Sequence, residues 1–439
     1  MLLSGWGRYP VVSSSVFRAE KVGDVGDRIA SSGSHTLIAR GAGRSYGDAA
    51  LNRGGDTVLM GRLNRMLAFD EDSGVVRCEA GVTMAELLDV FVPRGWFLGV
   101  TPGTKYVTVG GAIASDAHGK NQHRDGNFGD FVNSITLMLA SGAVIRCSEQ
   151  ENRDIFRSTL GGMGLTGVIL DAELRLQKVA GGFVQTRRLK SRDLAETIAL
   201  FDEHESAFQY SVAWVDCLAR SSRVGRGVLM FGNHADATQR SHMNISSRHL
   251  KVPIDLPAWL LNPVSLRAFN NLYYALSPRK NDAVEHFDGF FYPLDFLTDW
   301  NRLYGKRGFI QYQCVLPSTS STQSLRALLA LFGDHGHGSF LAVLKRFGRG
   351  RGGLSFPVDG YTVSLDIPMR DGLLAILDRA DQMVADEGGR VYLAKDARLS
   401  ARMFRQMYPD LPAWRRVKDR VDPDGLFASS LSDRLEITS

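Results

Sequence analysis

The chain has 439 residues, of which 44% are hydrophobic and 23% are charged. This balance is typical of a globular protein with room for two or more domains, and it excludes a disordered or low-complexity chain. The formal net charge of +5 is spread along the sequence, so it gives no sign of nucleic-acid binding and fits a phosphorylated substrate or an anionic membrane surface.

The most informative segment is ARGAGRSYGD, residues 39–48, which directly follows a short β-type run at 35–38. Its glycines Gly41, Gly43 and Gly47 let the backbone approach a ligand closely and present bare N–H groups, as phosphate-binding loops do. Their spacing almost matches the dinucleotide-binding fingerprint. That fingerprint also requires a helix after the loop and an acidic residue about 20 positions later, and neither follows here. We therefore predict a phosphate-binding loop that is not of the Rossmann type.

Short strands and turns continue beyond this loop. The sequence predicts strands at 57–60 and 75–78 and a hairpin over 134–146. A helix is predicted over 83–92, because its first threonine is followed three positions later by glutamate, which is the pattern of a capping box.

Two further glycine-rich blocks occupy residues 101–121 and 160–170. A single glycine-rich loop is a turn more often than a ligand site. Three such loops in one predicted domain indicate a long ligand that lies against the backbone. A flavin dinucleotide has the required length and carries a pyrophosphate.

The composition changes near residue 183, where the glycine-rich blocks stop and longer amphipathic segments alternate with strands. Alternation places Gln311 and Gln313 on one strand face, and it places Lys345 on the corresponding face of another strand. A helical stripe over 373–384 ends at a pair of glycines. The sequence therefore predicts an α+β domain that is built on an antiparallel sheet.

Four segments together carry a family resemblance: RGAGRSYGD, PGTKYVTVGGAIASDAHGKN, GGMGLTG and DPDGLF. They resemble the vanillyl-alcohol-oxidase type of FAD-binding oxidoreductase. Six more segments resemble the branch of this family that oxidises polyprenylphosphoryl ribose: GWGRYP, SVAWVDC, YPLDFLTDWNRLYG, FIQYQCVLP, YLAKDAR and FASSLSDRLE. The resemblance covers nearly the whole chain. It implies an α+β fold with a PCMH-type FAD-binding domain over 1–182, an antiparallel-sheet substrate (cap) domain over 183–390, and a segment over 391–439 that returns to the first domain.

The resemblance also implies which residues bind FAD. They are Ala39, Arg40, Gly41, Ala42, Gly43, Arg44, Ser45, Tyr46, Gly47, Asp48, Ala49, Gly103, Thr108, Val109, Gly110, Gly111, Ser115, Asp116, Ala117, His118, Ile169 and Tyr392. Many members of the family have, at the position of Arg44, a histidine that is bonded to the flavin. An arginine stays protonated and cannot act as that nucleophile, so we expect non-covalent FAD.

Oxidation of a secondary alcohol by a flavin requires an acceptor for the hydroxyl proton and positive charge near the reduced ring. The resemblance places Lys395 in the second role and beside the sugar hydroxyl. Tyr46 and His118 are the candidates for proton handling, and Gln313 is the remaining catalytic candidate. The implied substrate-binding residues are Lys120, Gln311, Gln313, Lys345 and Lys395.

These residues also have purely structural interpretations. Lysines are mostly exposed, so Lys395 fits a solvated side chain beside Asp396, and a lone histidine is usually structural. The shared face of Gln313 and Lys345 fits an exposed sheet face nearly as well as a pocket.

The apolar and aromatic segment 250–280 has basic residues near each end and supports two interpretations equally. One is a helix and loop that pack in the core. The other is a mobile flap over the active site that meets a membrane, where a polyprenyl tail rests.

The resemblance implies oxidation of the 2′-hydroxyl of a polyprenylphosphoryl-β-D-ribofuranose to the keto sugar. A separate NAD(P)H-dependent reductase would then produce the arabino epimer. The first alternative is an oxidase of a free sugar, alditol or aldonolactone in the same family. The second is a flavin-binding protein without turnover that serves as a partner of the reductase.

The four cysteines are far apart and form no CxxC pair, so we expect reduced core residues and no metal site. No apolar stretch reaches the length of a membrane span, and the N-terminus lacks the features of a secretory signal. We expect a cytoplasmic protein with peripheral contact to the inner membrane, and the periplasmic face is the alternative.

Overall fold

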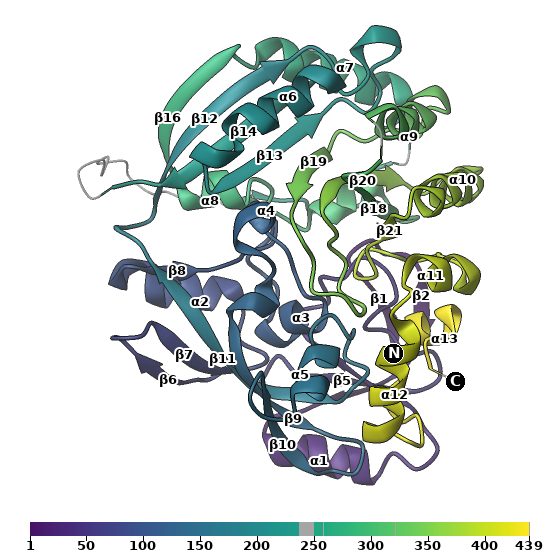
Figure 1. Ribbon diagram of the computed structural model, residues 1–439. Helices are drawn as coiled ribbons and strands as arrows, with labels where there is room; N and C mark the ends of the chain where they lie inside the picture. Colours follow the sequence, from purple (N-terminus) through teal and green to yellow (C-terminus); the bar gives the residue numbers. More distant parts are fainter. Residues whose placement is uncertain (237–249, 258, 321, 439) are drawn as a thin grey trace.

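The computed structural model describes residues 1–236, 250–257, 259–320 and 322–438. It has two layers, which are stacked vertically in Figure 1. The lower layer contains small sheets and short helices from the first part of the chain. The upper layer contains a large antiparallel sheet with helices on its outer face. The predicted α+β fold class is confirmed.

The lower layer begins with a β1–β2 ribbon and a three-stranded parallel sheet in the order β3-β5-β4. These elements are β1 (Leu2–Ser4), β2 (Val11–Ser13), β3 (Ser15–Arg18), α1 (Val22–Ala30), β4 (Leu37–Arg40) and β5 (Asp56–Leu59). No helix lies between β4 and β5. The glycine-rich loop that joins them is therefore not of the Rossmann type, as the sequence predicts.

A six-stranded antiparallel sheet completes the lower layer, in the order β10-β9-β11-β7-β6, and β8 pairs with β11. The strands are β6 (Met66–Asp70), β7 (Val75–Glu79), β8 (Trp96–Leu98), β9 (Val132–Met138), β10 (Val144–Ser148) and β11 (Val168–Lys178). The helices are α2 (Met84–Phe91), α3 (Val109–Ala114), α4 (Gln122–Asp125) and α5 (Arg153–Thr159). The capping box predicted at the start of α2 is confirmed, because Thr83 Oγ1 accepts from the Glu86 N–H at 3.2 Å and the Glu86 carboxylate accepts from the Thr83 N–H at 2.7 Å.

The upper sheet has eight strands in the order β16-β12-β14-β13-β19-β20-β18-β21. They are β12 (Phe183–Ser191), β13 (Tyr210–Val215), β14 (Gly227–His234), β16 (Lys280–His286), β18 (Phe309–Pro317), β19 (Ala342–Phe347), β20 (Gly360–Pro368) and β21 (Arg390–Val391). The helices α6 (Leu194–His204), α9 (Thr322–Asp334) and α10 (Leu373–Asp386) pack their apolar sides on its outer face. The other face turns toward the lower layer (Figure 1).

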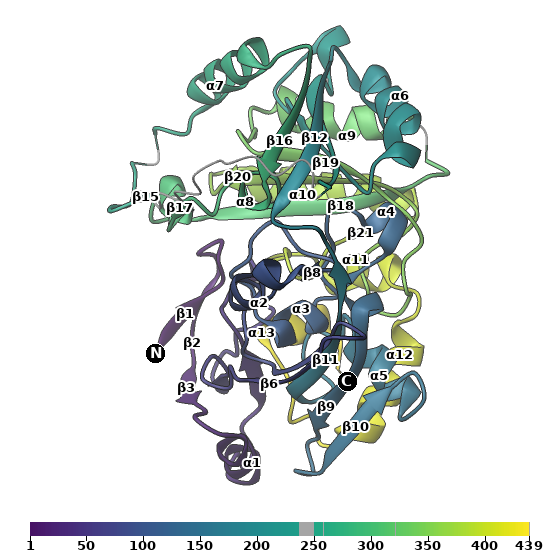
Figure 2. The ribbon, with the colours of Figure 1, turned by 90° about the vertical axis from the view of Figure 1, so that its left-hand side faces the viewer.

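Three further segments complete the upper layer. They are β15 (Leu250–Lys251) paired with β17 (Leu297–Thr298), α7 (Pro263–Leu276) and α8 (Phe287–Phe291). Figure 2 shows α7 standing away from the sheet on the left-hand side. None of the described helices combines the length and the hydropathy that a membrane span requires.

The end of the chain returns to the lower layer through α11 (Ala401–Met407), α12 (Leu411–Val421) and α13 (Ser430–Leu435). The Leu37 N–H in β4 donates to the Leu426 carbonyl at 2.7 Å, and Phe427 is buried in the core that surrounds β4 and β5. The C-terminal segment therefore packs beside the glycine-rich loop.

Candidate active site

The loop between β4 and β5 has the form of a phosphate cradle. The N–H groups of residues 42–45 donate to no other described residue. Gly43 has a φ of +65°, and a Cβ atom on Gly41 would lie 2.1 Å from Thr108 Oγ1. Consecutive free donors on a backbone without room for side chains fit the diphosphate of FAD.

Two other segments hold this loop in place. The Trp6 N–H donates to the Ser45 carbonyl at 2.8 Å, and the Tyr46 N–H donates to the Ala394 carbonyl at 3.0 Å. A Cβ atom on Gly47 would lie only 1.8 Å from the Asp396 carbonyl oxygen. The 39–48 loop is therefore packed directly against the turn that carries Lys395.

The two arginines of the loop differ in their surroundings. The Arg40 guanidinium donates to two backbone carbonyls, at 2.7 and 3.1 Å, and so supports the loop from within. The Arg44 guanidinium lies over the Trp6 ring, 4.1 Å from its centroid, and beside the Tyr106 ring. Its Nε is buried and has no hydrogen-bond partner among the described residues. Arg44 borders a small cavity of about 50 Å³, which Trp6 and Tyr106 also line.

The second predicted cofactor block, around α3, contains one residue with a structural role. The Asp116 carboxylate accepts from Asn127 Nδ2 at 2.8 Å and from the Gly129 N–H at 3.0 Å, and it also accepts from the Ser355 hydroxyl. These contacts hold the block in place. Ile169 is buried with the apolar residues of α3, and the Tyr392 hydroxyl donates to the Ser115 carbonyl at 2.9 Å.

His118 from this block meets the upper sheet. Gln313 Nε2 lies 2.9 Å from His118 Nε2, and in this orientation the amide donates and the imidazole accepts. Burial, reinforced by the charges of Lys345 and Lys395, holds the pKa of His118 well below its usual range. The imidazole is therefore neutral at physiological pH.

The register of the upper sheet collects polar side chains on the face that turns toward the lower layer. Gln311 pairs with Asp366, Gln313 pairs with Ser364, and Lys345 of β19 pairs with Thr362 of β20. Because directly opposite residues share a face, these six side chains project from the same side of the sheet. The predicted shared face of Gln311, Gln313 and Lys345 is confirmed.

Lys395 follows β21, and its Nζ lies 3.9 Å from the centroid of the Tyr46 ring. Burial lowers the pKa of Lys395, and the nearby Asp366 charge counteracts that fall. Asp366 is fully buried and accepts a hydrogen bond from Gln311, and burial raises its pKa. Burial also raises the pKa of Tyr46 well above its usual value, so its phenol stays protonated.

Two more lysines contribute to the positive charge of this region. Burial lowers the pKa of Lys345 to about 8. Burial, with a smaller contribution from the charge of Lys345, lowers the pKa of Lys120 to about 7. Lys120 Nζ donates to the carbonyls of Phe290 and Phe291 at 2.8 and 3.0 Å, whereas Lys345 has no hydrogen-bond or ion-pair partner among the described residues.

Sequence reasoning missed two residues that bear on the site. Asp366 lies two positions after Ser364 on β20, so strand alternation could have indicated it. Arg434 lies 2.8 Å from both Asp48 and Asp396 and so connects the cofactor loop with the Lys395 turn. Only the tertiary structure brings these three residues together.

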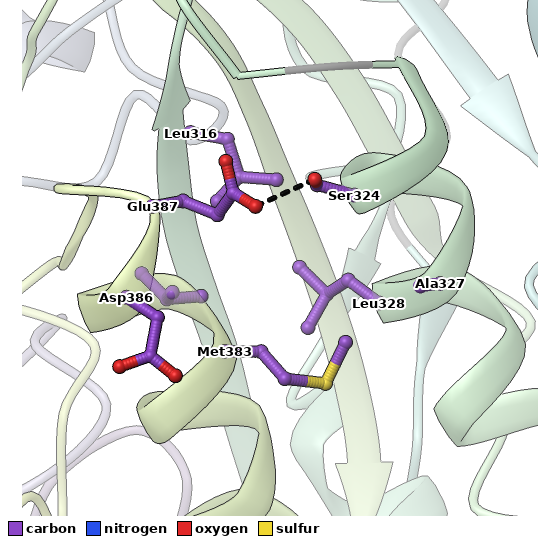
Figure 3. Close-up of a pocket in the computed structure, with 8 residues that line it drawn as sticks. Leu316, Ser324, Ala327, Leu328, Met383, Asp386 and Glu387 are labelled. Carbon is purple, nitrogen blue, oxygen red and sulfur yellow. Dashed lines mark hydrogen bonds between the residues drawn. The ribbon is translucent and has the colours of Figure 1, made fainter.

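A separate cavity of about 240 Å³ lies between α9 and α10, and Figure 3 shows its lining. Leu328 and Met383 contribute apolar surface, and Ser324 donates to Glu387 at 2.6 Å. Leu316 of β18 also lines it and projects from the face opposite to Gln313. The sheet therefore separates this cavity from the candidate active site.

Comparison with known proteins agrees with this geometry. Residues 14–148 match the FAD binding domain family, and residues 371–435 match the family described as D-arabinono-1,4-lactone oxidase. The chain is 37% identical to a decaprenylphosphoryl-beta-D-ribose oxidase of Mycolicibacterium smegmatis, over 99% of this chain and 97% of that protein. This chain belongs to the FAD-linked oxidoreductases of the vanillyl-alcohol-oxidase type.

The chain is also 25% identical to the L-gulonolactone oxidase of Mus musculus, over 90% of this chain and 88% of that protein. Together, these similarities identify an FAD-dependent oxidoreductase of the kind that oxidises sugars and lactones. The free N–H groups of the 39–48 loop and the polar face of the upper sheet suit that chemistry.

The close approach of Gly47 to the Lys395 turn gives a direct test of the cofactor loop. We expect Gly47→Ala to displace the loop and to lower the flavin content of the purified protein severalfold, as measured by the ratio of absorbance at the flavin band to that of the protein. Gly61→Ala is the matched control, because a Cβ atom there meets no atom within 4 Å. Equal flavin content in both variants would contradict this assignment of the loop.

Proposed function

We propose that this protein oxidises the 2′-hydroxyl of a polyprenylphosphoryl-β-D-ribofuranose to the 2′-keto sugar. The observation that carries the proposal is the charge of the candidate site, where Lys345 acts electrostatically on both Lys120 and Lys395. The buried Asp366 opposes the charge of Lys395, and Glu285, which lies near Lys120, is already paired with Arg188 at 2.7 Å. Such an excess of positive charge favours an anionic ligand. A sugar that is linked through a phosphate supplies that anion.

The similarity to the mycobacterial oxidase supports the same substrate class, because it extends over nearly all of both chains. FAD, when bound, supplies the acceptor for the hydride that leaves the sugar carbon. We propose that it is bound without a covalent bond, because Arg44 cannot act as a nucleophile toward the flavin.

The proton of the sugar hydroxyl needs a different acceptor, and Asp366 together with Lys395 is the best candidate. The Tyr46 phenol is already protonated, and the Nε2 lone pair of His118 is occupied by the Gln313 amide. Burial moves the pKa values of Asp366 and Lys395 toward each other, so the pair can accept a proton near neutral pH. In this mechanism, Gln311 orients Asp366, and Gln313 and His118 shape the wall beside the sugar.

The keto sugar is an intermediate in an epimerisation if a second enzyme reduces it from the opposite face. An NAD(P)H-dependent reductase is the class of enzyme that would consume it. We propose such a reductase as the functional partner.

One observation favours a second candidate function, the oxidation of a free sugar, alditol or aldonolactone. The C-terminal residues match the D-arabinono-1,4-lactone oxidase family, and an L-gulonolactone oxidase is a distant relative along most of the chain. Neutral substrates of this kind leave the positive charge of Lys345 without a partner, so we rank this function second.

A substrate comparison separates the two functions. We expect kcat/KM for a short-chain prenylphosphoryl ribose to exceed that for free ribose, alditols and aldonolactones by about 100-fold or more, since charge-assisted contacts each contribute substantially. Comparable values for a free lactone would favour the second function.

The proton-acceptor role predicts the behaviour of Asp366→Asn. Because a general base contributes about 10²- to 10⁴-fold to a rate, we expect flavin reduction by substrate to slow by about 100-fold while flavin content is unchanged. Ser364→Ala, on the same strand face, is the matched control and should stay within about twofold of the wild type because it removes no titrating group. An unchanged rate and pH profile in Asp366→Asn would remove Asp366 from the mechanism.

The lowered pKa of Lys345 predicts a pH dependence of substrate binding. The ammonium is present below a pKa of about 8 and is lost as the pH rises through that value, so KM for the phosphorylated substrate should rise in alkaline solution. An arginine stays protonated throughout this range, so Lys345→Arg should flatten the rise. KM profiles measured from pH 6 to 10, which is about two pH units to either side of this pKa, test the expectation. The same rise in both proteins would exclude Lys345 as its source.

A further inference from the structure

The exposed apolar side chains of this protein are concentrated on one face. Of the sixteen large hydrophobic side chains that are exposed in the described residues, ten belong to residues 250–296, two to the β1–β2 ribbon and one to Met1, which precedes it. Figure 2 shows the elements that carry many of them, namely β1, β2, β15 and α7, along the left-hand side of the molecule. We call this the apolar face. A patch of this kind is typical of a surface that contacts another partner.

The helix α7 turns its apolar stripe toward solvent, which is unusual for a helix at a protein surface. Its apolar stripe includes Val264, Leu272 and Leu276, which are 75%, 59% and 76% exposed. The opposite side holds Leu266 and the fully buried Asn270. A surface helix normally turns its apolar stripe to the core. The interpretation of segment 250–280 as core packing is therefore wrong for most of its large apolar side chains.

Polar contacts keep α7 in this orientation. Asn270 Nδ2 donates to Asp216 Oδ1 at 2.9 Å and to the Ser339 carbonyl at 3.2 Å. Asp216 is itself paired with the buried Arg226, at 2.7 Å. Because these buried groups depend on one another, rotation of α7 to bury its apolar stripe would break the network.

The apolar face continues to the candidate active site. Leu261, just before α7, packs on the cluster of Trp300, Tyr304 and Phe309, and Tyr46 packs on the same cluster. Asp255 in the preceding loop is paired with Arg8, which follows β1, at 2.6 Å. The β1–β2 ribbon and the 250–276 segment are therefore tied together beside the site.

The charges within residues 250–280 are mainly positive, and the acidic residues Asp282, Glu285 and Asp288 that follow are each paired with a basic residue. Residues 250–280 contain the basic residues Lys251, Arg267, Arg279 and Lys280 and one acidic residue, Asp255, whose charge is offset by Arg8. The Lys251 side chain is 68% exposed, and its Nζ lies 3.7 Å from the Asp299 carboxylate. Positive side chains that border exposed aromatic and aliphatic ones match the headgroup and acyl regions of an anionic bilayer.

We propose that the apolar face docks on the surface of a membrane that contains anionic phospholipid. The exposed side chains of α7 and of the loop before it enter the headgroup region, and the basic residues contact lipid phosphates. This inference rests on the surface alone and stands apart from the proposed sugar substrate. If that substrate is also correct, docking places Tyr46 and the apolar cluster next to the membrane in which a polyprenyl chain is anchored.

Flotation with lipid vesicles tests the proposal. Flavin-loaded full-length protein is mixed with vesicles of three parts phosphatidylcholine to one part phosphatidylglycerol, and with vesicles of phosphatidylcholine alone. We expect the protein to float with the first and to float less with the second. Leu272→Ser with Leu276→Ser should lower the apparent partition coefficient by about 10-fold or more, because two apolar side chains lose their burial.

The matched control is Leu67→Ser with Leu374→Ser, since these leucines are also exposed and lie outside the apolar face. It should float like the wild type. Leu2→Ser tests the β1–β2 ribbon separately and should weaken flotation without disturbing α7. Retention of flavin in every variant shows that the fold is preserved.

Absence of flotation by the wild type, or equal flotation of the two double variants, would overturn the proposal. A dimer in light scattering that dissociates in the Leu272→Ser, Leu276→Ser protein and does not float would assign the apolar face to a second copy of the chain. The measurement contains no sugar, so its result is independent of the substrate comparison. Flotation without oxidation of prenylphosphoryl ribose would leave docking intact and contradict only the proposed substrate.

Discussion

Lys120, Lys345 and Lys395 interact electrostatically in the candidate active site, where Asp366 opposes the charge of Lys395 and Glu285 that of Lys120, and the chemistry of the site depends on this balance. Burial opposes the charged form of each group, so the pKa values of the lysines fall and that of Asp366 rises. Lys120 is stabilised by two backbone carbonyls, and Lys395 by the Tyr46 ring and by Asp366. Lys345 has neither kind of partner among the described residues. The anionic substrate that we propose would provide what this lysine lacks.

The same region shows how the fold links the proposed cofactor loop to the proposed substrate-binding lysine. Arg434, near the end of the chain, is paired with Asp48 in the cofactor loop and with Asp396 next to Lys395. Gly47 and Tyr46 contact the same turn directly. The 39–48 loop and Lys395 are thus parts of one packed unit, so a shift of either displaces the other.

Local rules predicted much of this structure from the sequence. The capping box of α2, the β9–β10 hairpin and the absence of a helix after the 39–48 loop depend only on neighbouring residues. Strand alternation correctly placed Gln311 and Gln313 on one face. The pairing of Asp366 with Gln311 and Lys395 depends on which strands become neighbours, and periodicity does not encode that order.

The sequence also could not predict which polar side chains are buried or which way a surface helix turns its apolar stripe. Asp116 lies in a glycine-rich block and looks available to a ligand, yet its carboxylate is used by Asn127, Gly129 and Ser355. The periodicity of α7 shows an apolar stripe but cannot show that buried Asn270 turns it toward solvent.

A kinetic isotope measurement tests the central claim most directly. Prenylphosphoryl ribose with deuterium at C2 should reduce the flavin several times more slowly than the unlabelled compound, and deuterium at C3 should have little effect. Equal rates for the C2-labelled and unlabelled compounds, or an isotope effect at C3 alone, would contradict oxidation at the 2′ position.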